Sequence, residues 1–362
     1  MSGSSYAITY TVKNEARLLP DAIRYHAAQG CFHFYVYLDG TTDGTRESIL
    51  DLPNVTVLTS VPLAAEESYP AWMRDIAPMW DVNMDARKRF NTIDAAQRAR
   101  DAGIEWIISI DPDEIIYPCE PGTGKPIQIS DLLSSINAHV DQLLLKNLEA
   151  VPTRAPAGRG PFSQCVYFVQ RFDATDLVRR AIGTFVSKLS KSPKARAWSD
   201  HLVYRARLLG AYPRIMRDPR DGSAVPSSLF LGYTNHKAFM RSARAEYFNF
   251  NIHKWQKSVR KPISVSFGYL LHYDIFDWEY FSLKFRQRNS YMIIADFFVR
   301  HRLGEIAREC DDSEVELFFA ENIALDAVSV DQLVKKGVIR RIDDVAAFFE
   351  ASPERQSSAA DG

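Results

Sequence analysis

The segment WIISIDPDEIIYP, Trp106–Pro118, interrupts an apolar run with three carboxylates and then returns to apolar residues. Its apolar part is typical of a buried strand, where uncompensated charge is costly to bury. Pro112 fixes its own φ and favours an extended conformation for Asp111, so the backbone of this turn is stiff. The pattern therefore predicts a rigid acidic turn directly after a buried strand.

Strand-like and helix-like stretches alternate along the part of the chain that leads to this turn. The strand-like stretches are rich in β-branched and aromatic residues, and two of the helical ones end at a glycine. Strands are expected over 6–12, 33–40, 55–58 and 104–110, and helices over 15–30, 41–52 and 85–103. This alternation predicts an α/β fold with a mixed, mostly parallel sheet and flanking helices.

Beyond the acidic turn the alternation changes. Strands are expected over 139–148 and 164–172, and helices over 277–303 and 342–351. Residues 352–362 are small and polar, which predicts a disordered tail. We expect one domain over 1–275, divided at about residue 150 into a first half and a second half (151–275), and then a helical extension over 276–351.

The composition is that of an ordinary globular protein. Of the 362 residues, 46% are apolar and 25% are charged, and the formal net charge is −1. No global basic excess is present that would attract nucleic acid. The four cysteines are scattered without zinc-ligand spacing. Without a secretory signal or a long uncharged apolar window, we expect a cytoplasmic protein with no transmembrane segment; peripheral membrane contact stays open.

The acidic turn suggests metal chemistry. Ligands of a mostly parallel sheet bind beyond the carboxyl ends of its strands, and Asp111, Asp113 and Glu114 follow such an end. Carboxylates this close repel one another unless a cation intervenes. Mg²⁺ or Mn²⁺ takes oxygen ligands and keeps positions for phosphate oxygens. A bare DxD motif is more often a plain polar turn whose aspartates cap nearby amides, so the context of the motif has to decide.

Several motifs occur together in a family-like order. TVKNE (11–15), FYVYLDGTTDGT (34–45) and IDPDEII (110–116) resemble the N-terminal half of family 2-like and family 92-like glycosyltransferases. NHKAFMR (235–241), NIHKW (251–255) and LLHYDIFDWEYFSLKF (270–285) resemble their later blocks more loosely. The resemblance implies the GT-A fold. It also implies a metal-dependent enzyme that moves a sugar from a nucleotide-diphosphate donor, expected to be a UDP-sugar, to a glycan, lipid-linked or other hydroxyl acceptor with inversion.

The resemblance also implies where the donor binds. In this fold, the loop after the first strand and the end of the second strand hold the base and ribose. The matching residues here are Thr11, Lys13, Asn14, Glu15 and Asp39. Arg87 and Arg89 could reach the diphosphate, although a solvated helix face is the simpler interpretation. Lys237 and Arg241 are similar candidates.

The same resemblance implies a metal site. Asp111 matches the first aspartate of the motif, which contacts ribose or metal, and Asp113 matches the second, which ligates Mn²⁺ or Mg²⁺. Glu114 could form a hydrogen bond to a metal ligand or pair with an arginine, and both alternatives stay open. A histidine from the later blocks would complete the site, with His253 as the first candidate and His272 as the second, although a lone histidine is more often structural.

Inversion requires a base that removes the proton of the acceptor hydroxyl. Glu149 ends an expected strand between apolar neighbours, where burial would raise its pKa toward the working range. Asp200 and Glu246 are rivals, and a structural ion pair of Glu149 is an equal alternative. Trp72 or Trp80 could line the acceptor cleft, although most buried aromatic residues are simply core.

Two other functions stay open. A nucleotidyltransferase on a related fold would make the sugar nucleotide, but such enzymes carry a glycine-rich loop after the first strand, where this chain has KNEARLLP (13–20). A non-catalytic nucleotide-sugar-binding domain would not need the intact Asp111/Asp113 pair. Both alternatives are therefore less favoured than sugar transfer.

Overall fold

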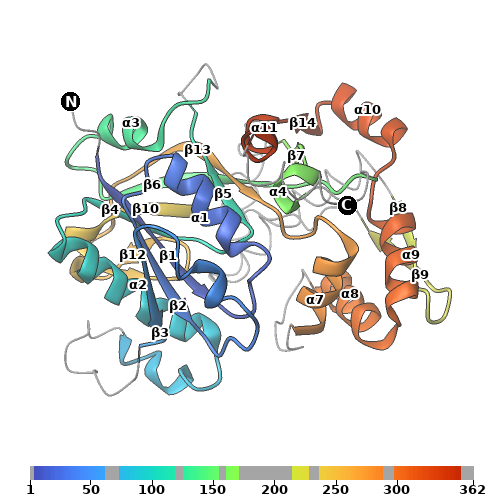
Figure 1. Cartoon of the computed structure of the whole chain (residues 1–362), viewed down its shortest axis with the longest axis horizontal. Helices are drawn as coiled ribbons and strands as arrows, with labels where there is room; N and C mark the ends of the chain where they lie inside the picture. The colour runs from blue at the N-terminus through green and yellow to red at the C-terminus, as the bar shows by residue number, and fades with distance from the viewer. Residues whose placement is uncertain are drawn as a thin grey trace, which may run out of the picture. The chain divides into compact units, whose positions relative to one another are not determined.

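The computed structural model describes residues 4–61, 73–119, 125–154, 160–170, 214–227, 236–287 and 297–351 (Figure 1). The chain forms two compact units. The first unit comprises residues 1–147 and 235–271, and the second comprises 148–234 and 272–362. By these bounds the chain changes unit three times: within strand β6 (Gln142–Glu149), between residues 234 and 235, and at the last residue of strand β13 (Ser264–His272).

The first unit is built on an eight-stranded sheet with the order β3-β2-β1-β4-β10-β6-β13-β5. The strands not yet located are β1 (Tyr6–Val12), β2 (His33–Leu38), β3 (Val55–Thr59), β4 (Trp106–Ser109), β5 (Glu114–Tyr117) and β10 (Lys237–Arg241). Strand β1 pairs in parallel with β2 and β4, and β2 pairs in parallel with β3. Strand β10 is antiparallel to both β4 and β6. The structure confirms the predicted α/β fold with a mixed sheet and flanking helices.

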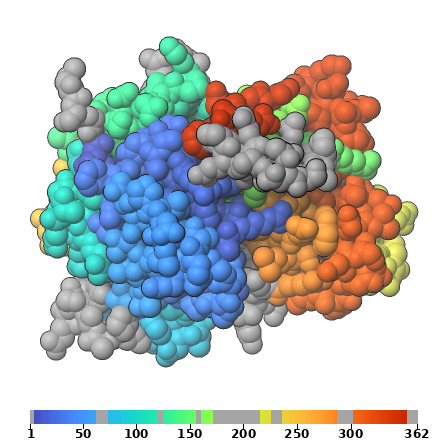
Figure 2. Space-filling view, in the orientation of Figure 1, coloured from blue at the N-terminus to red at the C-terminus, as the bar shows by residue number. Residues whose placement is uncertain are grey.

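Both faces of this sheet are covered by apolar residues. Ile8, Val36 and Ile108 belong to one core cluster, whereas their neighbours Ala7 and Ile107 belong to another. This alternation follows from the two-residue period of a strand, and burial on both faces is typical of parallel strands. In the space-filling view, the blue N-terminal segments form much of the surface of the first unit that faces the viewer (Figure 2).

Two long helices flank the parallel strands where the sequence predicts them. Helix α1 (Leu19–Ala28) contributes Leu19 and Ile23 to the first cluster. Helix α2 (Met84–Asp101) begins after Asn83, whose side chain accepts a hydrogen bond of 2.8 Å from the backbone N–H of Asp85. An asparagine at this position satisfies an N–H group that the helix itself leaves unpaired. The start of α2 is therefore determined by its own sequence.

The helix expected over 41–52 is wrong. Only a short 3₁₀ helix, η1 (Glu47–Ile49), forms there. Asp43 accepts a hydrogen bond of 3.0 Å from the N–H of Thr45 and another of 3.2 Å from the N–H of Ala16 in the preceding loop. Side chains that bind nearby backbone groups favour turns over helices, and here they also join two loops.

The remaining elements of the first unit lie outside the parallel strands. They are η4 (Ala77–Met79), α3 (Ile129–Ser134), η5 (Ser242–Tyr247), β11 (Phe248–Phe250) and β12 (Trp255–Lys257). Strands β11 and β12 form an antiparallel hairpin.

The second unit is mainly helical in its C-terminal part. Its elements are α4 (Pro161–Gln164), β7 (Tyr167–Val169), β8 (Arg214–Arg217), β9 (Ala224–Ser227), α7 (Trp278–Gln287), α8 (Phe297–Glu309), α9 (Asp312–Asn322), α10 (Ala327–Lys335), β14 (Ile339–Arg341) and α11 (Asp344–Ala351). Of the strand expected over 164–172, the structure shows β7 over three residues, and residues 171 and 172 lie outside the described part of the chain. The predicted tail over 352–362 lies outside the described residues. In the part of the chain that the structure describes, no helix is both long and apolar enough to cross a membrane.

A buried histidine connects α1 to β5. Nε2 of His26 accepts a hydrogen bond of 3.1 Å from the N–H of Ile116. The proton of the neutral ring is therefore on Nδ1, which donates to the carbonyl oxygen of Ala22 at 2.7 Å. Burial lowers the pKa of His26 to about 3, despite the opposing effect of the Ala22 carbonyl. The ring is neutral at physiological pH.

This histidine should make the stability of the fold sensitive to acid. Below about pH 6.5 His26 is protonated in the unfolded chain but stays neutral in the folded chain. The free energy of unfolding therefore decreases as the pH falls. We expect His26→Gln to destabilise the protein at pH 7 and the gap to wild type to narrow by up to about 2 kcal/mol at pH 5. Urea unfolding at both pH values measures it, and a gap independent of pH would contradict this role.

Candidate active site at the acidic turn

Two lysines meet the first aspartate of the acidic turn. Lys88 of α2 forms an ion pair with Oδ1 of Asp111, and Nζ of Lys237, the first residue of β10, lies 3.1 Å from Oδ2. Lys237 also lies 3.2 Å from Oε2 of Glu114. The side chains of Lys88 and Lys237 are 5% and 4% exposed, whereas that of Asp111 is 36% exposed. Asp111 therefore has two buried ammonium partners and still contacts solvent.

The turn is closed by its own hydrogen bonds. The side chain of Glu114 accepts a bond of 2.7 Å from the N–H of Asp111, and the N–H of Glu114 donates to the carbonyl oxygen of Asp111 at 3.0 Å. Asp113, between them in the chain, is buried. The rigidity that Pro112 predicts is thus reinforced by a reciprocal pair of bonds.

Charge pairing controls the ionisation of this cluster. Burial by itself would raise the pKa of Asp111, but the attraction of Lys237 and Lys88 outweighs it and holds the pKa well below its usual range. Burial likewise opposes the charge of Lys237, but Asp111 and Glu114 raise its pKa above the ordinary value. Asp111 and Lys237 are therefore charged at neutral pH.

The hairpin of β11 and β12 carries His253 in a constrained turn. The side-chain oxygen of Asn251 accepts hydrogen bonds from the N–H groups of His253 at 3.2 Å and Lys254 at 3.1 Å. Ile252 has a φ of 68°, in the left-handed region that a β-branched residue rarely adopts. Strain of this kind is often found at functional sites, and here it accompanies a turn that orients His253.

His253 belongs to the same electrostatic cluster. Its pKa is lowered well below the usual range by burial and by the charges of Lys237 and Lys88. Its Nδ1 atom is buried and has no hydrogen-bond partner among the described residues. A neutral imidazole in these surroundings is able to act as a ligand or hydrogen-bond partner.

The donor set of the acidic turn fits a divalent cation in its chemistry. Asp111 and Asp113 offer carboxylate oxygens and His253 offers an imidazole nitrogen, which suits Mn²⁺. The unpartnered Nδ1 of His253 agrees with such a role. Among the described residues, however, the ligand atoms of these three are not all gathered within 4.8 Å of one another. The participation of His253 therefore stays a prediction.

The loops after β1 and β2, which the sequence predicts to hold the donor, are tied together. Oδ1 of Asn14, a residue with a φ of 58°, accepts a hydrogen bond of 2.8 Å from the N–H of Thr42. The N–H of Glu15 donates to the hydroxyl of Thr45 at 2.8 Å. Lys13, next to them, is exposed to solvent. The two loops form one preorganised surface at the carboxyl ends of their strands.

Helix α2 holds the end of β2. Nε and Nη2 of Arg87 bind the two carboxylate oxygens of Asp39 at 2.6 and 2.9 Å, and the hydroxyl of Ser60 donates to Asp39 at 2.9 Å. Arg89 binds the carbonyl oxygen of Phe250 in the hairpin at 2.5 Å. The interpretation of these two arginines as a solvated helix face is therefore wrong.

Two site residues on α2 were not found from the sequence, namely Lys88 and Asn91. Asn91 is buried, donates to the hydroxyl of Thr11 at 3.1 Å and accepts from the N–H of Val61 at 2.9 Å. Lys88 lies seven positions before the buried Ala95 and Asn91 lies four positions before it, so all three residues are on the same face of the helix. The sequence feature that could have identified them is a polar residue at a position of the predicted helix that its period assigns to the buried face.

Other predicted residues have structural roles or lie elsewhere. Arg241 pairs with Glu105, and its guanidinium carbon lies 4.2 Å from the ring centroid of Trp106. Glu246 is exposed. The rival base Asp200 and the acceptor candidate Trp72 lie outside the described residues.

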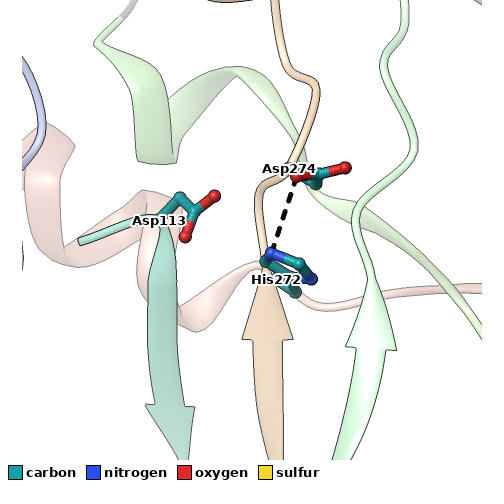
Figure 3. A group of neighbouring side chains, drawn as sticks. All are labelled: Asp113, His272 and Asp274. Atoms are coloured by element: carbon teal, nitrogen blue, oxygen red, sulfur yellow. Dashed lines mark ion pairs between the residues drawn. The ribbon is translucent and has the colours of Figure 1, made fainter. Parts of the chain in front are cut away.

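The second unit holds the predicted base and the second histidine. Glu149, the last residue of β6, is buried. Nε2 of His272, the last residue of β13, lies 3.8 Å from Oδ1 of Asp274 (Figure 3). The same oxygen of Asp274 pairs with Nζ of Lys284 at 2.5 Å. Figure 3 also draws Asp113 of the first unit, directly before β5.

The first part of the chain matches a known family. Residues 7–150 match the model of glycosyltransferase family 92, which confirms the family 92-like resemblance of this segment. Two glycosyltransferase-like proteins of Arabidopsis thaliana are 27% and 29% identical to this chain over 159 and 160 residues. The matches cover 41% and 42% of this chain and 34% and 30% of the relatives, so the chain spans about a third of their length.

Two solved structures show a distant similarity. A glycosyltransferase involved in the glycosylation of the major capsid of PBCV-1 has 14% identity and a TM-score of 0.20, with 42% of this chain and 53% of that chain covered. A mycobacterial protein has 12% identity and a TM-score of 0.24, with 67% and 88% covered. Both TM-scores are low, so the fold assignment rests on the sheet of this chain.

Removing the Arg87 guanidinium that binds Asp39 should destabilise the first unit. Among the described residues, Arg87→Met leaves the buried carboxylate of Asp39 with Ser60 as its side-chain partner, so we expect a loss of about 2–4 kcal/mol in the free energy of unfolding. Adding Asp39→Asn removes the unpaired charge and should restore at least about 1 kcal/mol. Urea unfolding of the single and double variants tests this pairing, and a loss below about 1 kcal/mol for Arg87→Met would show that Asp39 does not depend on it.

Proposed function

From a family 92-like segment over residues 7–150, we propose that this chain is a glycosyltransferase that uses a nucleotide-diphosphate sugar, with UDP as the expected nucleotide. The observation that carries the proposal is the acidic turn within this segment. It follows β4, a strand of the parallel part of the sheet, and joins Asp111 to Lys88 and Lys237. Ligands of such sheets bind beyond the carboxyl ends of the strands.

The donor would lie across the loops that follow β1, β2 and β4. The joined loops of Asn14 and Thr42 offer a rigid edge for the base and ribose, and rigid polar groups bind with little ordering cost. Arg87 binds both carboxylate oxygens of Asp39, which fixes the orientation of this side chain. The diphosphate would then approach the exposed side of Asp111.

A divalent cation, Mn²⁺ or Mg²⁺, is part of the proposal. Asp111 and Asp113 would hold it, with His253 as the expected further ligand and His272 as its rival. When bound, the ion would supply Lewis-acid stabilisation of the charge on the departing diphosphate. The protein's own contribution is to keep Asp111 ionised, through Lys88 and Lys237, and to keep the turn rigid, through Glu114.

The acceptor side of the proposal rests on Glu149. A buried carboxylate at a strand end is suited to remove a proton from an acceptor hydroxyl, since burial raises the basicity of a carboxylate. Transfer with inversion, to a glycan, lipid-linked or other hydroxyl acceptor, requires one such base.

Nucleotide binding decides among the candidate functions. In titration calorimetry, UDP should bind in the presence of Mn²⁺ and more weakly in EDTA, and a UDP-sugar should be hydrolysed slowly without an acceptor. Pyrophosphate-dependent turnover of the sugar nucleotide would favour a nucleotidyltransferase instead. Nucleotide binding without hydrolysis or transfer would favour a non-catalytic binding domain.

The second aspartate of the turn should be required for metal-dependent donor binding. Asp113→Ala is expected to remove the increase in UDP affinity that Mn²⁺ causes, because it deletes a carboxylate ligand. Asp101→Ala, which removes an exposed carboxylate at the end of α2, is the matched control and should bind like wild type. Calorimetry with both variants measures this, and an unchanged Mn²⁺ effect in Asp113→Ala would refute the assigned role.

The predicted base should affect transfer and spare binding. Glu149→Gln keeps the size of the side chain but cannot accept the proton, so we expect unchanged UDP affinity and a loss of transfer of about 10²-fold or more. Glu246→Gln, at an exposed rival position, serves as the control. If Glu149→Gln transfers sugar at the wild-type rate in a donor-consumption assay, the base lies elsewhere.

A further inference from the structure

Two lysines pair with Asp111 of the acidic turn, although one ammonium group would be enough to balance the charge of one carboxylate. Lys237 already bridges Asp111 and Glu114, yet Lys88 of α2 adds a second ammonium group to Asp111. Both lysines are almost fully buried. Burying a lysine is costly unless its charge is well paired. We therefore asked what function the burial of Lys88 could serve.

The charge balance of the cluster bears on metal binding. Asp111 and Glu114 pair with the two ammonium groups, which balances the charges of these four side chains, and Asp113 adds a further carboxyl group to the turn. A divalent ion at Asp111 would be attracted by the carboxylates. It would also be repelled by both lysines, because they bind the same Asp111 carboxylate that would hold the ion. Repulsion at such short range, in a partly buried place, is screened little by water or salt.

A diphosphate would change this balance. It brings at least two negative charges to the exposed side of Asp111, which compensates both a divalent ion and the lysines behind the carboxylate. An ion and a nucleotide that each supply what the other lacks bind cooperatively, and this coupling is reciprocal.

We propose that Lys88 and Lys237 make metal binding at the acidic turn depend on the nucleotide. The two buried ammonium groups keep the affinity for a free divalent ion low, and the diphosphate of the donor provides the charge that allows the ion to bind. This inference rests on the proposed function, because it assumes a diphosphate donor at Asp111. It assigns to Lys88 a positioning and selectivity role that is separate from holding α2 in place.

The test measures binding of Mn²⁺ alone and together with UDP, in titration calorimetry of the whole chain. For wild type we expect weak binding of Mn²⁺ alone and at least about tenfold tighter binding with saturating UDP. Lys88→Met keeps the length of the side chain and removes its charge, so the affinity for Mn²⁺ alone should rise at least about tenfold and the effect of UDP should shrink.

Two control variants separate charge from packing. Lys88→Arg keeps the positive charge and should keep the weak binding of Mn²⁺ alone. Arg98→Met removes a charge from the same helix that pairs with Asp94. It lies ten residues along α2, about 15 Å away, and should bind Mn²⁺ like wild type.

The outcomes separate this inference from the proposed function. Equal Mn²⁺ affinity in wild type and Lys88→Met would overturn the inference, and so would an equal rise in Lys88→Arg. If Lys88→Met does not fold, Lys237→Met and Lys237→Arg provide the same comparison, and the same two results would overturn the inference. A failure of UDP to bind wild type overturns the proposed function, whereas the effect of the lysines on Mn²⁺ alone is measured without any nucleotide.

Discussion

The site of the first unit depends on the contacts of helix α2. Three consecutive residues reach three different places: Arg87 binds Asp39 at the end of β2, Lys88 binds the acidic turn, and Arg89 binds the hairpin that carries His253. Successive residues point about 100° apart around a helix, so one turn is able to serve three loops. The loops are thereby located by one rigid element, and the geometry of the proposed donor site follows from the position of that helix.

Charge compensation explains why a buried strand is followed by three carboxylates. The sequence predicts that a cation must join them, and the structure shows that part of the compensation comes from the chain itself, through Lys88 and Lys237. The turn is also closed by the bonds between Asp111 and Glu114. A site built in this way keeps Asp111 ionised and fixed, which preorganises it for a charged ligand.

Local patterns predicted most of the strands and helices of the first unit, because these elements are set by periodicity and by caps such as Asn83. The expected helix over 41–52 is wrong, since Asp43 and Thr45 bind backbone groups of their own turn and of the neighbouring loop. From the sequence, Arg87 is expected at the diphosphate and Asp39, separately, at the base and ribose. Nothing in the linear order shows that these residues, 48 positions apart, share one bidentate ion pair.

The sequence by itself determined the α/β class, the acidic turn after β4 and the family-like order of motifs over about residues 6–150, because these are properties of neighbouring residues and their spacing. Only the tertiary structure decided which charges surround that turn. Lys88 lies 23 positions from Asp111 in sequence and Lys237 lies 126 positions away. They meet Asp111 because β10 pairs with β4 and α2 packs on the sheet. Long-range pairing of this kind is set by the packing of the whole core, which no local pattern records.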